Sequence, residues 1–322
     1  AEAVAELRAG ADRSTGLVRE FTGLHAAEHS APVLIVDRAG WVQANADGFA
    51  QIIEPLVHKL QGSRGKHAGA QSGDRSGGIG HAIGSRVTGA EVGLLLGFLG
   101  GKVLGQFDPF HSVDGRLLLV APNIVHVERE IDADPHDFRL WVCLHEETHR
   151  VQFTAVPWMR DHLLGEMGSL VESVEPSSLL DGGIKRLSES LRGAGGGSLL
   201  DMVSTPEQQA IIDRVTGVMS LLEGHADVVM DDVGPTVIPS VARIRKAFTR
   251  RRQGIGTLDR LLRRLLGLDA KMAQYRDGAV FVRTVVDKVG MADFNAVWSG
   301  PEQLPTKAEI HDPAGWVTRV LG

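Results

Sequence analysis

Residues 137–153, DFRLWVCLHEETHRVQF, contain the stretch that decides the fold, a His-Glu-x-x-His motif at His145–His149. We expect a helix to begin just before it, because Asp134 is a good N-cap residue and Pro135 suits the first helical position. Apolar residues and both histidines then recur three or four positions apart, which places them on one helix face. These residues are Phe138, Trp141, Val142, His145 and His149.

The motif itself predicts a metal site. His145 and His149 lie four residues apart, so their rings project side by side from a helix and reach one zinc ion at about 2.0–2.1 Å. Glu146 lies about 100° further around the helix, which suits it to hold and deprotonate a water molecule. The alternative is a surface helix that carries two histidines, but the apolar residues before the motif argue against it.

A catalytic zinc ion needs a third protein ligand and an open position. The continuation found in metzincins requires glycine at position 152 and histidine at position 155, and this chain has Gln152 and Ala155 there. A sulfur-rich site is excluded because Cys143 is the only cysteine. The third ligand must therefore come from elsewhere in the chain.

The best candidates lie in Leu221–Asp232, LLEGHADVVMDD, within a strongly helical stretch. Glu223 and Asp227 are four residues apart and share a helix face. Their spacing is similar to that of gluzincin peptidases, which implies Glu223 as the zinc ligand and Asp227 as the hydrogen-bond partner of a ligand histidine. His225 lies about 200° around the helix from Glu223. His225 and Asp227 remain the alternative third ligands.

Several blocks of the chain resemble a family of uncharacterised zincin-like hydrolases from actinobacteria and chloroflexi. Members of that family are associated with the biosynthesis of a deazaflavin coenzyme. The resemblance implies a zincin-like metallopeptidase fold with a gluzincin-type zinc site, and it does not identify a substrate. It rests on Val87–Asp108, Leu117–Glu130, Asp137–Phe153, Leu221–Asp231 and the run from Phe294 to Trp316.

The remaining periodicity predicts a mainly α protein with a small sheet. The apolar runs Val33–Val36 and Arg116–Val120 are the expected strands. Helical spacing extends over Glu207–Asp232 and Thr257–Gly290. We expect residues 1–322 to form a single zincin-like unit, with the active-site blocks at 116–153 and 215–235.

The composition of the chain indicates a folded protein. The chain has 322 residues, of which 43% are hydrophobic and 23% charged, as in an ordinary folded protein. The glycine- and serine-rich stretches 61–89 and 192–198 are expected to be flexible.

Val92–Leu104 is too short to cross a bilayer, so we expect a buried helix there and no membrane span. The first ten residues do not read as a signal peptide, which favours the cytoplasm.

Arg243–Arg264 contains nine basic residues and one acid, Asp259. A nucleic-acid surface is one interpretation, but Phe248 is the only aromatic residue there and the chain carries a net charge of −6. Leucines between 258 and 266 fit one buried stripe instead. We interpret the segment as the solvated face of a helix and do not expect nucleic acid as a partner.

These features together predict a zinc-dependent hydrolase that cleaves a peptide or another small amide. Glu146 would act as the general base, while His145, His149 and Glu223 would hold the metal. His126, His225 and Tyr275 are further candidates for the cleft. The alternative is a non-catalytic zincin-like protein whose metal site is structural or vestigial and which acts as an interaction module. Neither the stabiliser of the tetrahedral intermediate nor an oligomeric state follows from the sequence.

Overall fold

The computed structural model describes all residues except 26–30, 49–92, 94–95, 174–204 and 254–267. Two stretches that were expected to be flexible, 61–89 and 192–198, therefore lie outside the described residues. So do the leucines between 258 and 266 and residues 92, 94 and 95 of the apolar stretch 92–104. Residues 96–100 of that stretch are helical, and Leu96 and Leu99 pack against a small apolar cluster formed by Trp41, Ala44, Leu118 and Val120.

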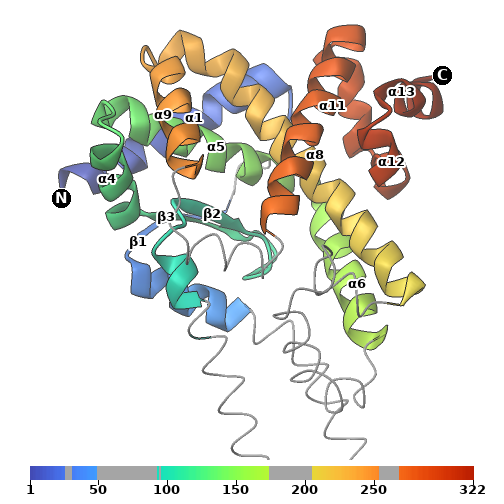
Figure 1. Ribbon diagram of the computed structural model, residues 1–322, viewed down its shortest axis with the longest axis horizontal. Coiled ribbons are helices and arrows are strands. Elements are labelled where there is room, and N and C mark those ends of the chain that lie inside the picture. Colours follow the sequence, from blue (N-terminus) through green and yellow to red (C-terminus); the bar gives the residue numbers. More distant parts are fainter. Residues whose placement is uncertain (26–30, 49–92, 94–95, 174–204, 254–267) are drawn as a thin grey trace, which may run out of the picture.

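A small three-stranded sheet lies below α5 (Pro135–Ala155), with the helix of residues 38–48 on its other side (Figure 1). Its order is β1 (Val33–Val36), β3 (Arg116–Val120) and β2 (Gly105–Asp108). Strand β1 runs parallel to β3, whereas β2 runs antiparallel to it. The central strand β3 is buried throughout, because it has neighbours on both edges and packs under the helices. The two predicted strands are confirmed, whereas β2 was not predicted.

The rest of the described chain is mainly helical, as predicted. Residues 38–48 also form a helix. The named helices are α1 (Glu2–Thr22), α4 (Ala121–Glu130), α5 (Pro135–Ala155), α6 (Pro157–Ser173), α8 (Pro206–Val237), α9 (Val241–Gln253), α11 (Leu268–Phe294), α12 (Lys307–Ile310) and α13 (Pro313–Leu321), with the short 3-10 turns η1 (Asn295–Trp298) and η2 (Pro301–Gln303).

Helix α5 lies at the centre, in contact with α1, α8 and strands β2 and β3 (Figure 1). It begins as the sequence predicted: the Asp134 side chain accepts a hydrogen bond from the Asp137 N–H, and Pro135 occupies the first turn. Phe138 and Leu144 are completely buried. Because most faces of α5 are covered, the polar residues of its motif are held by packing as well as by hydrogen bonds.

Helix α8 is also capped firmly, since Thr205 and Gln208 form a reciprocal capping box at its start. Farther along, α8 crosses α11 at backbone contact distance. A Cβ atom added to Gly224 would lie 2.2 Å from the carbonyl carbon of Gly278, and one added to Gly278 would lie 1.9 Å from the Ser220 carbonyl oxygen. Only glycine at both positions allows this approach. It sets the distance between α8 and α11 at Gly224, the residue that follows Glu223.

We expect Gly224→Ala to destabilise the protein by about 3 kcal/mol, the upper end of the range for overpacking, because two backbones cannot separate cheaply. The free energy of unfolding, measured by urea denaturation, checks this. Gly16→Ala is the matched control: Gly16 is a helical glycine with no atom within 4 Å of its added Cβ. In that control the free energy of unfolding should rise by about 0.5–1 kcal/mol. Equal stability of the two variants would contradict the close crossing.

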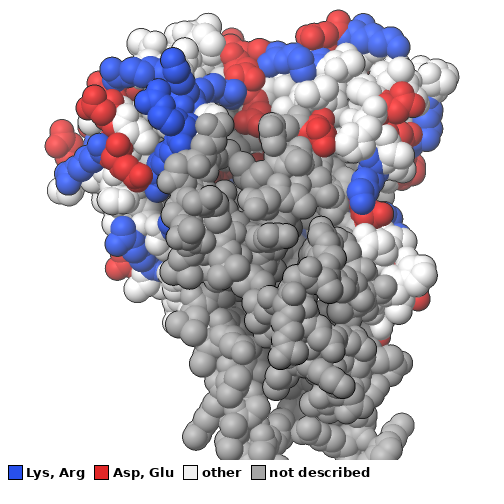
Figure 2. Space-filling model, viewed as in Figure 1, with Lys and Arg blue, Asp and Glu red and all other residues white. Residues whose placement is uncertain are grey.

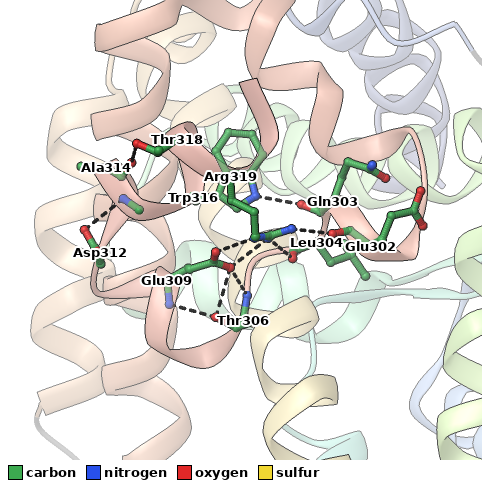
Figure 3. Close-up of polar contacts among 11 residues, drawn as sticks. Glu302, Gln303, Leu304, Thr306, Glu309, Asp312, Ala314, Trp316, Thr318 and Arg319 are labelled. Atoms are coloured by element: carbon green, nitrogen blue, oxygen red, sulfur yellow. Dashed lines mark hydrogen bonds and ion pairs between the residues drawn. The ribbon is translucent and has the colours of Figure 1, made fainter. Parts of the chain in front are cut away.

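The C-terminal elements close over one side of α8 and α11 (Figure 3). Arg319 makes two hydrogen bonds to the Glu309 carboxylate and two more to the carbonyl oxygens of Glu302 and Leu304. The indole N–H of Trp316 donates to the Gln303 carbonyl oxygen. These bonds hold α13, α12 and η2 together and keep the Trp316 ring in the core.

The Glu309 carboxyl gives this region a defined response to acid. Hydrogen bonds from Arg319, and then from Thr306, lower its pKa from the ordinary value of 4.5. A carboxyl whose pKa is lower in the folded state stabilises the fold above its unfolded pKa, and this contribution is lost as pH falls through the folded pKa.

At pH 7 we therefore expect Glu309→Gln to lower the free energy of unfolding by about 1.5–3 kcal/mol, the range for a hydrogen bond to a charged group. The difference from the wild type should shrink as pH falls below 4.5. Urea unfolding at a series of pH values measures it. Glu20→Gln, on the exposed side of α1, serves as the control. A difference that grows on acidification would contradict the assignment.

The basic segment forms α9 over its described part, residues 241–253. Ile244 is buried, and the Phe248 ring meets Trp141 edge-on at 5.1 Å. Two of its arginines are paired, Arg245 with Asp231 and Arg251 with Glu130. Lysine and arginine side chains gather over this part of the surface with acidic side chains among them (Figure 2). This arrangement is typical of a solvated helix face that is held by ion pairs.

None of the helices among the described residues has the length and apolar character that a membrane crossing requires.

Candidate metal centre

The crossing of α5 and α8 brings three side chains together, which we call the ligand group: His145, His149 and Glu223. One ligand atom from each lies within 4.8 Å of the other two. The Nε2 atoms of the two histidines are 3.3 Å apart. Nε2 of His149 is 3.6 Å from Oε1 of Glu223, and Nε2 of His145 is 3.8 Å from Oε2 of the same carboxylate. The two histidines of the motif and the distant glutamate that the sequence singled out therefore meet at one point.

The donor atoms suit a divalent metal ion. Each histidine turns its Nδ1 atom away from the group: His149 toward the amide oxygen of Gln152 at 3.0 Å, and His145 toward the sulfur of Met230 at 3.2 Å. Both Nε2 atoms and a carboxylate thus converge, which is a nitrogen and oxygen donor set of the kind zinc takes. The three side chains are 27%, 13% and 25% exposed, so the group is accessible from solvent.

Glu146 lies beside the ligand group and is not part of it. Its side chain packs against the start of β2, where a Cβ atom on Gly105 would lie 2.6–2.8 Å from three of its atoms. Only glycine leaves room for the carboxylate at this position. Burial raises the pKa of Glu146 well above its ordinary value, and the carboxylates of Glu223 and Glu147 act in the same direction.

The second glutamate of the motif, Glu147, faces the opposite side of α5. Its Oε2 atom accepts hydrogen bonds from Thr15 on α1 and from the Arg150 guanidinium. Arg150 also donates to the Ala31 carbonyl oxygen and to Thr15. Glu147 is completely buried, and burial raises its pKa. This network attaches α5 to α1, so the two adjacent glutamates of the motif have different surroundings.

The structure places Asp227 away from the ring nitrogens that it was expected to contact. Its carboxylate lies 3.9 Å from the Arg245 guanidinium, and the side chain is 45% exposed. The Nδ1 atoms of the two histidines face Met230 and Gln152 instead. The reason is helical phase. At about 100° per residue, Met230 returns to within about 20° of Glu223 on the buried side, whereas Asp227 is turned about 40° toward α9.

The other cleft candidates fall in different places. His225 is completely buried, stacks on Phe294 with ring centroids 5.8 Å apart, and is absent from the ligand group, so it does not line a cleft. Burial lowers its pKa to about 3, and the nearby His149 acts in the same direction. His126 is exposed on α4 near Glu130. Tyr275 lies in α11, and its side chain is outside the described part of the structure.

Sequence reasoning missed three contacts of the site. Gln152 follows His149 by three residues, a helical spacing that places both on one face and that could have indicated the contact. Met230 follows Glu223 by seven residues, again on one face. Gly105 carried no signal, because only the packing of β2 on α5 shows that a side chain there would meet Glu146.

Two histidines four residues apart on one helix, with a glutamate directly after the first, form the HExxH pattern that is typical of zinc metalloproteases. This chain belongs to the zincin-like metallopeptidase family, whose sequence model matches residues 1–317. The resemblance inferred from the sequence blocks is thereby confirmed.

A solved structure from Chloroflexus aurantiacus, described as "a putative hydrolase with a novel fold", is similar over most of the chain. It shares 30% sequence identity, and the match covers 98% of this chain and 89% of that one, with a TM-score of 0.71. No curated protein gave a significant match.

Proposed function

We propose that this protein is a zinc-dependent hydrolase that cleaves an amide bond in a peptide or a small molecule. The observation that carries the proposal is the convergence of His145, His149 and Glu223 with Glu146 beside them. The family and the similar hydrolase from Chloroflexus support the same class of reaction.

In this proposal the three residues of the ligand group hold zinc. When bound, zinc supplies a Lewis acid that polarises the carbonyl group and acidifies water. The Glu146 carboxylate accepts a proton from the attacking water and passes it to the leaving nitrogen. Its place between α5 and β2, against Gly105, keeps it next to the ligand group without joining it.

The exposure of the ligand group favours catalysis over a purely structural site. Structural zinc sites are closed by four protein ligands, whereas catalytic sites use three and keep one position for water or substrate. Within the described residues the group has three members, and each side chain is partly exposed. A non-catalytic interaction module is the alternative that the experiment must separate.

Zinc-loaded and zinc-stripped protein, incubated with a defined library of synthetic peptides and analysed by mass spectrometry, tests the proposal. We expect new peptide termini with the loaded protein, none with the stripped protein, and recovery when zinc is added back. A protein that holds one zinc ion per chain and leaves the whole library intact would favour the non-catalytic alternative.

A further inference from the structure

Gln152 is completely buried on α5, one helical turn after His149, and its amide group touches two helices. The oxygen, Oε1, lies 3.0 Å from Nδ1 of His149. The nitrogen, Nε2, lies 3.0 Å from the Leu222 carbonyl oxygen and 2.9 Å from Nδ1 of His225. Leu222 and His225 lie on either side of Glu223 on α8. One amide group therefore joins a histidine of the ligand group to the helical turn that carries its glutamate.

The Leu222 carbonyl determines which way the amide points. A carbonyl oxygen only accepts hydrogen bonds, so the end of the amide that faces it must be the NH₂ group. The amide oxygen then faces His149, and because that oxygen only accepts, Nδ1 of His149 must carry the proton. In a neutral imidazole this leaves the lone pair on Nε2, the atom that faces His145 and Glu223.

We propose that Gln152 is the positioning residue of the metal centre, because its amide, oriented by Leu222, fixes the ring plane and the tautomer of His149. This inference deepens the proposed function, since it concerns how a zinc ligand is prepared before the metal arrives. Gln152 replaces the carboxylate that we expected from Asp227. A neutral amide orients the imidazole without adding a negative charge next to Glu146 and Glu223.

The same contacts explain the burial of His225. Its Nδ1 atom accepts a hydrogen bond from the Gln152 amide, so its own proton lies on Nε2. That Nε2 atom is buried with no hydrogen-bond partner among the described residues, and the ring packs against Phe294 and Trp298. His225 thus contacts the nitrogen end of the amide and is not a member of the ligand group. The Leu222 carbonyl alone is sufficient to orient the amide.

Nitrogen-15 NMR of the imidazole rings in the metal-free wild type tests the proposal directly. We expect His149 to have a protonated Nδ1 and an unprotonated Nε2, with its signals assigned by their loss in His149→Ala. An Nε2-protonated His149 would overturn the proposal, and this measurement needs no variant of Gln152. It is also independent of catalysis, so a protein that cleaves no peptide can still confirm or overturn the role of Gln152.

Gln152→Leu and Gln152→Met remove the amide at similar side-chain volume. We expect His149 to become a mixture of tautomers in both, while His145 keeps its spectrum. The zinc dissociation constant, measured by chelator competition, should rise about 10–100-fold, as for other residues that orient metal ligands. Thr148→Val is the matched control, because Thr148 is buried on α5 and its hydroxyl, within the described part of the chain, bonds to the Leu144 carbonyl in its own helix.

The control should keep the His149 tautomer and zinc affinity within about threefold, even where it lowers the unfolding temperature. Circular dichroism establishes that each variant is folded. A folded Gln152→Leu or Gln152→Met protein with the wild-type tautomer and zinc affinity would overturn the proposal. An equal loss of zinc affinity in Thr148→Val would overturn it too, because the effect would then be general loosening of α5.

Discussion

Glu146→Gln is expected to lower kcat/KM for a cleaved peptide by about 10²–10⁴-fold, the usual contribution of a general base, while zinc stays bound at about one ion per chain. The amide keeps nearly the same shape in the space beside Gly105, but it cannot accept a proton from water. Elemental analysis of the variant and a peptide-cleavage assay give the two readouts.

The matched control is the adjacent residue of the motif. Glu147→Gln changes a completely buried carboxylate that bonds to Thr15 and Arg150 and faces away from the ligand group. We expect it to lower the unfolding temperature while the folded protein keeps hydrolysis within a few-fold of the wild type. Loss of zinc in Glu146→Gln would instead make Glu146 a ligand and remove it from the role of base.

His149→Ala is expected to abolish both zinc binding and hydrolysis. In the proposed site His149 is one of three ligands, so its loss would remove a direct bond to the metal. The zinc dissociation constant should therefore rise by more than the roughly 100-fold that marks the upper end for residues that only orient a ligand. Glu223→Ala should behave in the same way, because its carboxylate faces the Nε2 atoms of both histidines. Chelator competition measures both constants.

Asp227→Asn provides the control for Glu223→Ala, one turn farther along the same helix. Its carboxylate faces Arg245 and is 45% exposed, so zinc affinity should stay within about threefold of the wild type. His126→Ala is the control for His149→Ala, because His126 is exposed on α4. A 10–100-fold loss in Asp227→Asn would restore the role that the gluzincin spacing implied for Asp227.

The motif helix could be predicted from the sequence because every signal in it agrees. Asp134 and Pro135 mark its start, apolar spacing marks its buried face, and the two histidines share a side of the helix. Glu223 could be predicted because it lies in a strongly helical stretch, four residues before Asp227, a spacing similar to that of gluzincin peptidases. The structure places these residues together through the close α8–α11 crossing and the packing of α5 against α8.

The failures have equally specific causes. Spacing alone placed Asp227 near Glu223, but it could not show that α9 and Arg245 lie on that side of α8. Gln152 stands where a metzincin has glycine. Its neutral amide carries no metal-binding signal in the sequence. Strand β2 has the sequence Gly-Gln-Phe-Asp, which has little intrinsic strand preference, so pairing with β3 determines its conformation.

The most direct test of the central claim is anomalous diffraction at the zinc absorption edge from crystals of the zinc-loaded protein. We expect one strong peak among Nε2 of His145, Nε2 of His149 and a carboxylate oxygen of Glu223, at about 2.0–2.2 Å from each. Glu146 should lie outside the coordination sphere. The absence of a peak, or a peak coordinated by His225 or Asp227 with Glu223 turned to solvent, would contradict the account.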